Sequence, residues 1–160
     1  GDMSNSLQMT AAELFGKSNV HIQTLTTSTF TKSSKLNIEK SFQKIAQAAK
    51  PEDIVVVYLS GHGVNYGADK VQFYYLTKDV ATGDLSDAQI RENYAISTNE
   101  FTEMLKAIAA QKQIMIIDAC SSGGLIDNVS LVQATSVPEP STLGVFFAAA
   151  FGLFSMRRAK

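Results

Sequence analysis

Apolar residues occur along the chain in two kinds of run, one spaced as in a helix and one short and continuous. Helical spacing recurs over residues 4–16 and 38–49, and in each stretch the apolar residues share one face. Pro51 ends the second of these helices. The β-branched runs Ile54–Leu59 and Ile114–Ile117 predict strands that are buried on both faces of a sheet.

Three further stretches complete the predicted order of elements. Val20–Thr26 alternates as a strand does, and Val71–Leu76 predicts a strand or one arm of a hairpin. Ser97–Glu100 has the pattern of a capping box, and an apolar helical stripe follows it from Phe101 to Ala109. Helices and strands therefore alternate along the chain, which predicts an α/β fold with a mostly parallel sheet and crossover helices.

The composition is that of an ordinary globular protein, with 45% hydrophobic residues, 18% charged residues and a net charge of −1 across 160 residues. A charge so close to neutral argues against nucleic acid as the main partner. We expect one folded domain over residues 1–130, followed by a separate segment over residues 131–160.

Two reactive side chains lie just after the two β-branched runs. Cys120 is the only cysteine, so it forms no internal disulfide, and a free cysteine taken alone is most often a small buried hydrophobe. His62 stands between Gly61 and Gly63, and Asp118 lies two residues before Cys120. Because neighbouring parallel strands end at one edge of a sheet, we expect His62 and Cys120 to meet there as a base and a nucleophile.

The segments Tyr58–Gly63 and Ile117–Gly123 together resemble the His and Cys blocks of caspase-like cysteine peptidases, most closely those of the metacaspase or orthocaspase branch. The resemblance covers residues 3–124 and implies a caspase-like three-layer sandwich with helices on both faces of the sheet. In this family one strand precedes the first helix and others follow the Cys strand. The sequence shows no counterpart of these strands, so we expect the sheet to lack its first and last strands.

The resemblance also assigns a candidate site. Cys120 corresponds to the nucleophile, His62 to its base, and the backbone N–H groups of Gly63 and Cys120 to the oxyanion hole. Asp118 corresponds to the acid in the pocket for an Arg or Lys side chain, so the implied reaction is peptide hydrolysis after Arg or Lys. We expect Asp118 to be buried, in which case a cationic substrate side chain would balance its charge.

Residues 64–94 form the least regular part of the sequence, and metacaspases often bind activating calcium through acids in this region. The candidates here are Asp69, Asp79, Asp84 and Asp87. Calcium takes six to eight oxygen ligands, and these acids are scattered rather than gathered in one compact loop. We therefore expect no metal site and no cofactor.

The end of the sequence has a different character. Val137–Thr142 contains Pro-Glu-Pro, an apolar run covers residues 143–156, and Arg157 and Arg158 follow it. This segment resembles the PEP-CTERM sorting signal of Gram-negative bacteria. The resemblance implies an exported or inner-membrane-anchored protein, with its tail end cytoplasmic until an exosortase-type enzyme processes it. We expect a membrane-embedded hydrophobic helix over residues 143–156, and an export signal preceding Gly1.

Two alternatives to a peptidase stay open from the sequence. One is a catalytically inactive caspase-like module that binds or scaffolds a partner, and the other is an exported surface protein whose only clear signal is sorting. The presence of both His62 and Cys120 favours the enzyme, whereas the absent strands favour the binding module. Reaction of the thiol with a peptide that carries Arg discriminates between the enzyme and the other two.

Overall fold

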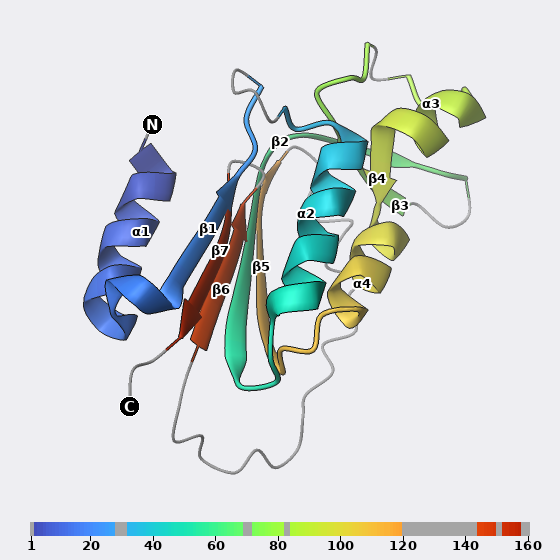
Figure 1. Cartoon of the computed structure of the whole chain (residues 1–160). Helices are drawn as coiled ribbons and strands as arrows, with labels where there is room; N and C mark the ends of the chain where they lie inside the picture. Colours follow the sequence, from blue (N-terminus) through green and yellow to red (C-terminus); the bar gives the residue numbers. More distant parts are fainter. Residues whose placement is uncertain are drawn as a thin grey trace.

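A computed structural model describes residues 2–27, 32–68, 72–81, 84–119, 144–149 and 152–157, and these form an α/β arrangement of helices around one sheet (Figure 1). In chain order the elements are α1 (Asp2–Phe15), the 3-10 helix η1 (Lys17–Asn19), β1 (Val20–Thr24), α2 (Lys35–Ala48), β2 (Asp53–Tyr66), β3 (Gln72–Leu76), α3 (Ala88–Tyr94), β4 (Ala95–Ser97), α4 (Thr98–Lys106), β5 (Lys112–Ala119), β6 (Gly144–Ala149) and β7 (Gly152–Arg157).

Strand β2 is buried on both faces of the sheet. Successive side chains of a strand point to opposite faces, and in β2 each set packs against a different cluster. Val55, Val57 and Leu59 belong to the main core cluster, together with residues of α2 and α4. Val56 lies on the other face and packs in a second cluster with Ala11 of α1. The described part of the chain therefore has three layers: α2 and α4, the sheet, and α1.

The end of α1 and the start of α4 lie where the sequence predicts, whereas α4 ends at Lys106 and not at Ala109. Gly16, at φ 83°, follows the last residue of α1, and its N–H donates to the carbonyl of Ala12 at 3.0 Å. The predicted capping box is confirmed at the start of α4, where the Ser97 hydroxyl accepts from the Glu100 N–H and the Glu100 carboxylate accepts from the Ser97 N–H. The Lys35 ammonium on α2 lies 2.5 Å from the same carboxylate, so α2 and α4 are joined at this point.

Burial by itself raises the pKa of the Glu100 carboxyl group, but its partners outweigh this effect. Hydrogen bonds from Lys35 and Ser97, and the charge of Lys35, leave the pKa below its ordinary value. The Lys35 ammonium also donates to the carbonyl of Ala95 at 2.9 Å. The pair therefore fixes β4 and the start of α4 against α2.

The sheet is mixed, so the prediction of a mostly parallel sheet is wrong. β5 runs parallel to β2, whereas β3 runs antiparallel to β2 and to β4. β6 and β7 form an antiparallel hairpin between β1 and β2, in which β6 is parallel and β7 antiparallel to both neighbours. Short hairpin connections supply antiparallel partners that the βαβ pattern alone does not predict.

The prediction that Ile114–Ile117 is buried on both faces is also wrong. The side chains of β5 alternate: Met115 and Ile117 pack against the main core, whereas Ile114 is 50% exposed and Ile116 is 44% exposed. The main core covers one face of β5. Among the described residues, α1 contacts β1, β6 and β7 but covers little of the outer face of β5.

The predicted helix over residues 143–156 is wrong for the described parts of this run, which form the strands β6 and β7. Short apolar runs fit a buried strand as well as a buried helix, and Gly144 and Gly152 bound two segments of strand length. The hairpin also satisfies backbone groups of β1 and β2, which lie on either side of it. Among the helices that the structure describes, none is long and apolar enough to cross a membrane.

The region predicted to be irregular, residues 64–94, contains the short helix α3, and the short strand β4 follows it directly. α3 is only seven residues long and is capped by the Asp87 side chain, which accepts from the Gln89 N–H. β4 adds three residues to the sheet next to β3. Such short elements carry too few apolar positions to show a clear period in the sequence. The predicted hairpin arm at Val71–Leu76 is confirmed as β3 over Gln72–Leu76.

Candidate active site

His62 lies inside a strand rather than after one, because β2 continues through it to Tyr66. Sequence reasoning placed the end of this strand at Leu59. The strand continues because β3 pairs antiparallel with it from this point, with His62 opposite Leu76 and Gly63 opposite Tyr75. The His62 side chain is exposed, so the ring is accessible to a substrate.

The pairing between β2 and β5 brings the His and Cys segments together. Ser60 lies opposite Asp118, and Gly61 lies opposite Ala119, in a parallel register. These pairs are the residues that lead directly into His62 and Cys120. Cys120 itself lies outside the described residues. The sequence-based expectation that both segments meet at one edge of the sheet thus agrees with the register up to Ala119.

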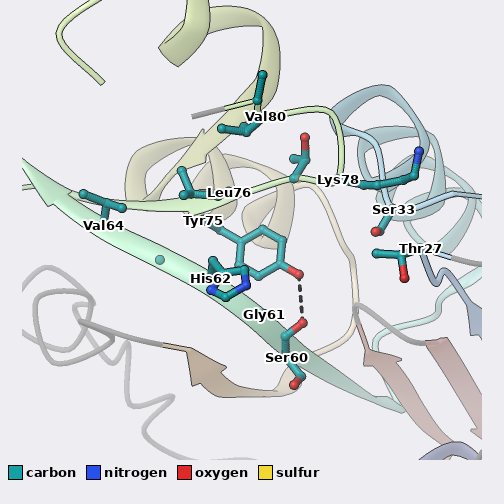
Figure 2. Close-up of a pocket in the computed structure, with 13 residues that line it drawn as sticks. Thr27, Ser33, Ser60, Gly61, His62, Val64, Tyr75, Leu76, Lys78 and Val80 are labelled. Carbon is teal, nitrogen blue, oxygen red and sulfur yellow. Dashed lines mark hydrogen bonds between the residues drawn. The ribbon is translucent and has the colours of Figure 1, made fainter. Parts of the chain in front are cut away.

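Gly61 is required at its position because Tyr75 packs directly against it. A Cβ atom at position 61 would lie 2.8 Å from the Tyr75 hydroxyl oxygen and 3.2 Å from two carbon atoms of its ring. The Tyr75 hydroxyl donates to the carbonyl of Ser60 at 3.0 Å, as the dashed line in Figure 2 shows. The Tyr75 ring also meets Phe101 edge-on, with centroids 6.2 Å apart. Tyr75 therefore joins the backbone before His62 to the main core.

Burial raises the pKa of Tyr75 from 10.0 to about 12. The side chain is almost completely enclosed, at 4% exposure, and the charged phenolate would lose its hydration there. Tyr75 is therefore a neutral hydrogen-bond donor at physiological pH, and its role beside His62 is to hold the backbone.

Asp118 is exposed, so the prediction that its carboxylate is buried is wrong. Every second side chain of β5, including that of Asp118, lies on its outer face. No layer of described residues covers this face. The Asp118 carboxylate accepts from the Tyr58 hydroxyl of β2 at 3.3 Å. An exposed carboxylate needs no buried counter-charge, and it can bind a cation that arrives with a substrate.

A pocket of about 670 Å³ opens beside His62. Figure 2 shows Val64 and Leu76 on one side of the His62 ring and Thr27, Ser33 and Lys78 on the other, with Val80 above the ring and the Lys78 nitrogen at the end of its side chain farthest from His62. The remaining lining residues are Ser60, Gly61, Gly63, Tyr75, Thr77 and Ala81. The pocket thus combines an apolar wall with a polar wall that carries a positive charge.

The described residues contain no group of three His, Cys, Asp or Glu side chains that could hold a metal ion. Two of the acids considered for calcium have other partners: Asp84 accepts from the Ser86 N–H, and Asp87 caps α3. Asp69 lies outside the described residues.

Sequence reasoning did not identify Tyr75 or Lys78 as site residues. Their positions depend on the hairpin that folds β3 back along β2. One signal was present in the sequence, because Phe73 and Tyr75 alternate with Gln72 and Tyr74 and so mark an inward face. That signal predicts burial of Tyr75, but it does not predict which glycine the ring covers.

A parallel strand pair that leads into a histidine and a cysteine at one edge of a sheet is the arrangement expected of a caspase-like cysteine peptidase. The chain belongs to the metacaspase family: the metacaspase peptidase C14 domain matches residues 2–129. Residues 136–159 match the PEP-CTERM protein-sorting motif. No curated protein and no solved structure matches the chain. Both resemblances found in the sequence are thereby confirmed.

Proposed function

We propose that the protein is a cysteine endopeptidase in which Cys120 and His62 form the catalytic dyad. The observation that carries this proposal is the parallel register of Gly61 with Ala119, because one further residue along each strand leads to His62 and to Cys120. Membership of the metacaspase family supports the same reaction class. The exposure of His62 supports it as well, since the ring must reach a peptide in solution.

In the proposed reaction His62 accepts the proton of the Cys120 thiol, and the sulfur attacks the carbonyl carbon of the peptide bond. The N–H groups of Gly63 and Cys120 stabilise the negative charge that develops on the carbonyl oxygen. The C–N bond then breaks, and His62 returns the proton to the leaving amine. A water molecule hydrolyses the resulting thioester and regenerates the thiol.

The proposed substrate carries Arg or Lys immediately before the cleaved bond, with Asp118 as the residue that binds it. The carboxylate lies on β5 two residues before Cys120 and opposite Ser60 on β2. The carboxylate is exposed, and among the described residues it accepts a hydrogen bond only from the Tyr58 hydroxyl. It is therefore available to a cation. Because dissolved salt screens the attraction between exposed charges, we expect the preference for Arg or Lys to weaken as salt is added.

The PEP-CTERM motif marks the chain for export by a sorting pathway of Gram-negative bacteria. We propose that an exosortase-type enzyme processes this segment and that the peptidase acts beyond the inner membrane. We further propose that the residues of the peptidase domain end near residue 130, and that the sorting segment contributes β6 and β7, which pair with β1 and β2 in the same sheet. Mass spectrometry of the protein recovered from the cell envelope would identify the processed end.

Replacement of Cys120 tests the proposed activity. The full chain is incubated with fluorogenic peptides ending in Arg, Lys or Asp, with and without calcium. We expect cleavage after Arg and Lys, and Cys120→Ala should lower the rate at least about 1,000-fold while the circular dichroism spectrum stays unchanged. His62→Asn should have a similar effect.

His21 provides the matched control, because it is the only other histidine and its side chain is exposed on β1. The His21→Asn variant should retain the wild-type rate. Residual cleavage by Cys120→Ala would overturn the assignment of the nucleophile. A folded wild-type protein that cleaves none of these peptides would instead favour a binding module of the same family.

A further inference from the structure

The positive side of the His62 pocket has a fixed geometry. The backbone N–H of Lys78 donates to the carbonyl of Ser33 at 3.1 Å, and the Val80 N–H donates to the carbonyl of Thr77 at 3.1 Å. The Thr77 hydroxyl donates to the carbonyl of Tyr94 at 2.6 Å, which fixes the start of this turn. The backbone at Lys78 is therefore held in place, so the ammonium group changes position only through rotation about the side-chain bonds.

Lys78 forms no ion pair with a described residue, unlike two other lysines. Lys35 and Lys106 are each paired with a glutamate, at 2.5 and 2.8 Å. The Lys78 ammonium forms no hydrogen bond or ion pair with another described residue. The pocket that it lines contains no Asp or Glu among the residues that the structure describes. The Lys78 side chain is exposed, and an ammonium group at the edge of such a pocket favours an anionic partner.

Two hydroxyl groups lie on the same wall of the pocket as this charge, one from Ser33 and one from Thr27 (Figure 2). A hydroxyl group both donates and accepts hydrogen bonds, an ammonium group only donates, and a carboxylate only accepts, so the ammonium decides the preference of this wall. The wall therefore matches a carboxylate better than it matches an amide or a cation. The opposite wall, with Val64 and Leu76, matches apolar atoms.

We propose that Lys78 determines specificity by binding the side chain of an Asp or Glu in the substrate peptide. This inference rests on the proposed peptidase function and extends it to a second position of the peptide. Asp118 lies on β5 and Lys78 follows β3, so a bound peptide meets a negative charge and a positive charge at two different places. The preferred substrate thus carries Arg or Lys before the cleaved bond and an acidic residue at another position.

Peptides of matched sequence test this inference on the full chain. Each carries Arg before the cleaved bond, and Glu, Gln or Lys is placed in turn at the three positions on either side. At one of these positions we expect Glu to raise kcat/KM roughly 2- to 5-fold over Gln, as one exposed ion pair allows. The advantage should shrink in 1 M salt, where the screening length is about 3 Å.

Charge reversal at position 78 then identifies the residue responsible. Lys78→Gln should remove the advantage of Glu, and Lys78→Glu should replace it by an advantage of Lys at the same position. Lys40→Glu is the matched control, because Lys40 is exposed on α2 and does not line the pocket. An unchanged preference in Lys78→Glu, or an equal shift in Lys40→Glu, would overturn the proposal.

A binding measurement separates this proposal from the proposed activity. The affinities of the Glu and Gln peptides for Cys120→Ala protein are compared by fluorescence anisotropy. In one outcome the wild-type protein cleaves none of the peptides, yet the Cys120→Ala variant binds the Glu peptide more tightly than the Gln peptide, and this difference requires Lys78. The peptidase proposal then fails and the Lys78 proposal stands. Equal affinity for the two peptides, or no binding of either, would refute the role of Lys78.

Discussion

Strands β2 and β5 look alike in the sequence but have different surroundings in the structure. Each contains a β-branched or apolar run and leads into a reactive residue. In β2 the residues Val55, Val56 and Val57 are all at most 2% exposed. In β5 the apolar residues alternate, and Ile114 and Ile116 are about half exposed.

The difference shows that burial of a strand depends on the layers beside it and not on its own composition. α1 covers the face of β2 that carries Val56, whereas no described element covers the corresponding face of β5. The exposed face of β5 also carries Asp118. The same feature that leaves two isoleucines exposed therefore makes the proposed substrate-binding carboxylate accessible.

The largest expected effect comes from placing the same charge on the two strands. Val56→Asp puts a carboxylate into a site that is 2% exposed, and we expect it to cost at least about 4 kcal/mol and to prevent folding. Ile116→Asp puts the same group at a site that is 44% exposed, and we expect a loss of about 1 kcal/mol or less. Urea unfolding followed by circular dichroism measures both. Equal losses would mean that a part of the chain outside the described residues covers β5.

A pH series tests how firmly Tyr75 holds β2. Because folding raises the pKa of Tyr75 from 10.0 to about 12, the folded protein keeps this proton over a range in which the unfolded chain releases it. The stabilisation is complete below pH 10 and is lost between pH 10 and about 12, at a total of roughly 2–3 kcal/mol.

The Tyr75→Phe variant isolates this contribution. Its free energy of unfolding should fall less steeply than that of the wild-type protein above pH 10, because other groups titrate equally in both. At pH 7 the variant should be less stable by about 1 kcal/mol, since the Ser60 carbonyl loses its donor. Tyr94→Phe removes an exposed hydroxyl and serves as the control. Parallel alkaline slopes for wild-type protein and Tyr75→Phe would contradict the assignment.

In the register of β2 and β5, Gly61 lies opposite Ala119. Replacing each residue by the other residue type compares the two strands directly. Gly61→Ala brings a methyl group against Tyr75, and we expect it to cost about 1–3 kcal/mol through overpacking. Ala119→Gly should cost only about 0.5–1 kcal/mol, through backbone entropy. Thermal unfolding of both variants measures the difference.

The double variant Gly61→Ala with Tyr75→Phe shows whether the hydroxyl is the source of the strain. The closest contact of the added methyl group is with this oxygen, so its removal should recover part of the loss that Gly61→Ala causes. If the two substitutions are simply additive, the ring moves aside and Gly61 is not fixed by Tyr75.

Much of the main framework follows from local patterns in the sequence. Ser97 and Glu100 predict the start of α4, and the β-branched run from Ile54 predicts β2, because caps and continuous apolar runs are local features. The end of β2 is not predictable in this way. Its extension through His62 depends on β3, which pairs with it only after the chain has turned back.

The site is predictable to a similar extent. His62, Asp118 and Cys120 are reactive residues next to apolar runs, so a local pattern identifies them. The exposure of Asp118 depends on which face of β5 lacks a helix, and the place of Lys78 depends on the hairpin after His62. Both are tertiary features. The tail shows the same limit, since residues 143–156 are apolar in a way that fits a helix or two strands.

The smallest expected effect concerns a side-chain hydrogen bond between the two strands, from Tyr58 to Asp118. Tyr58→Phe removes the donor to the Asp118 carboxylate, a 3.3 Å bond between a half-buried phenol and an exposed acid. We expect stability to change by no more than about 0.5 kcal/mol. We also expect the preference for Arg over Gln before the cleaved bond to stay within about two-fold of wild type, because the charge remains.

Asp118→Asn provides the comparison, since it keeps the shape of the side chain and removes its charge. Under the proposed function this variant should lose the preference for Arg in peptide cleavage assays, whereas Tyr58→Phe should retain it. If both variants lost the preference equally, the carboxylate would need the Tyr58 hydroxyl to hold it in place. Specificity would then depend on contact between β2 and β5, and not on the exposed charge of β5 alone.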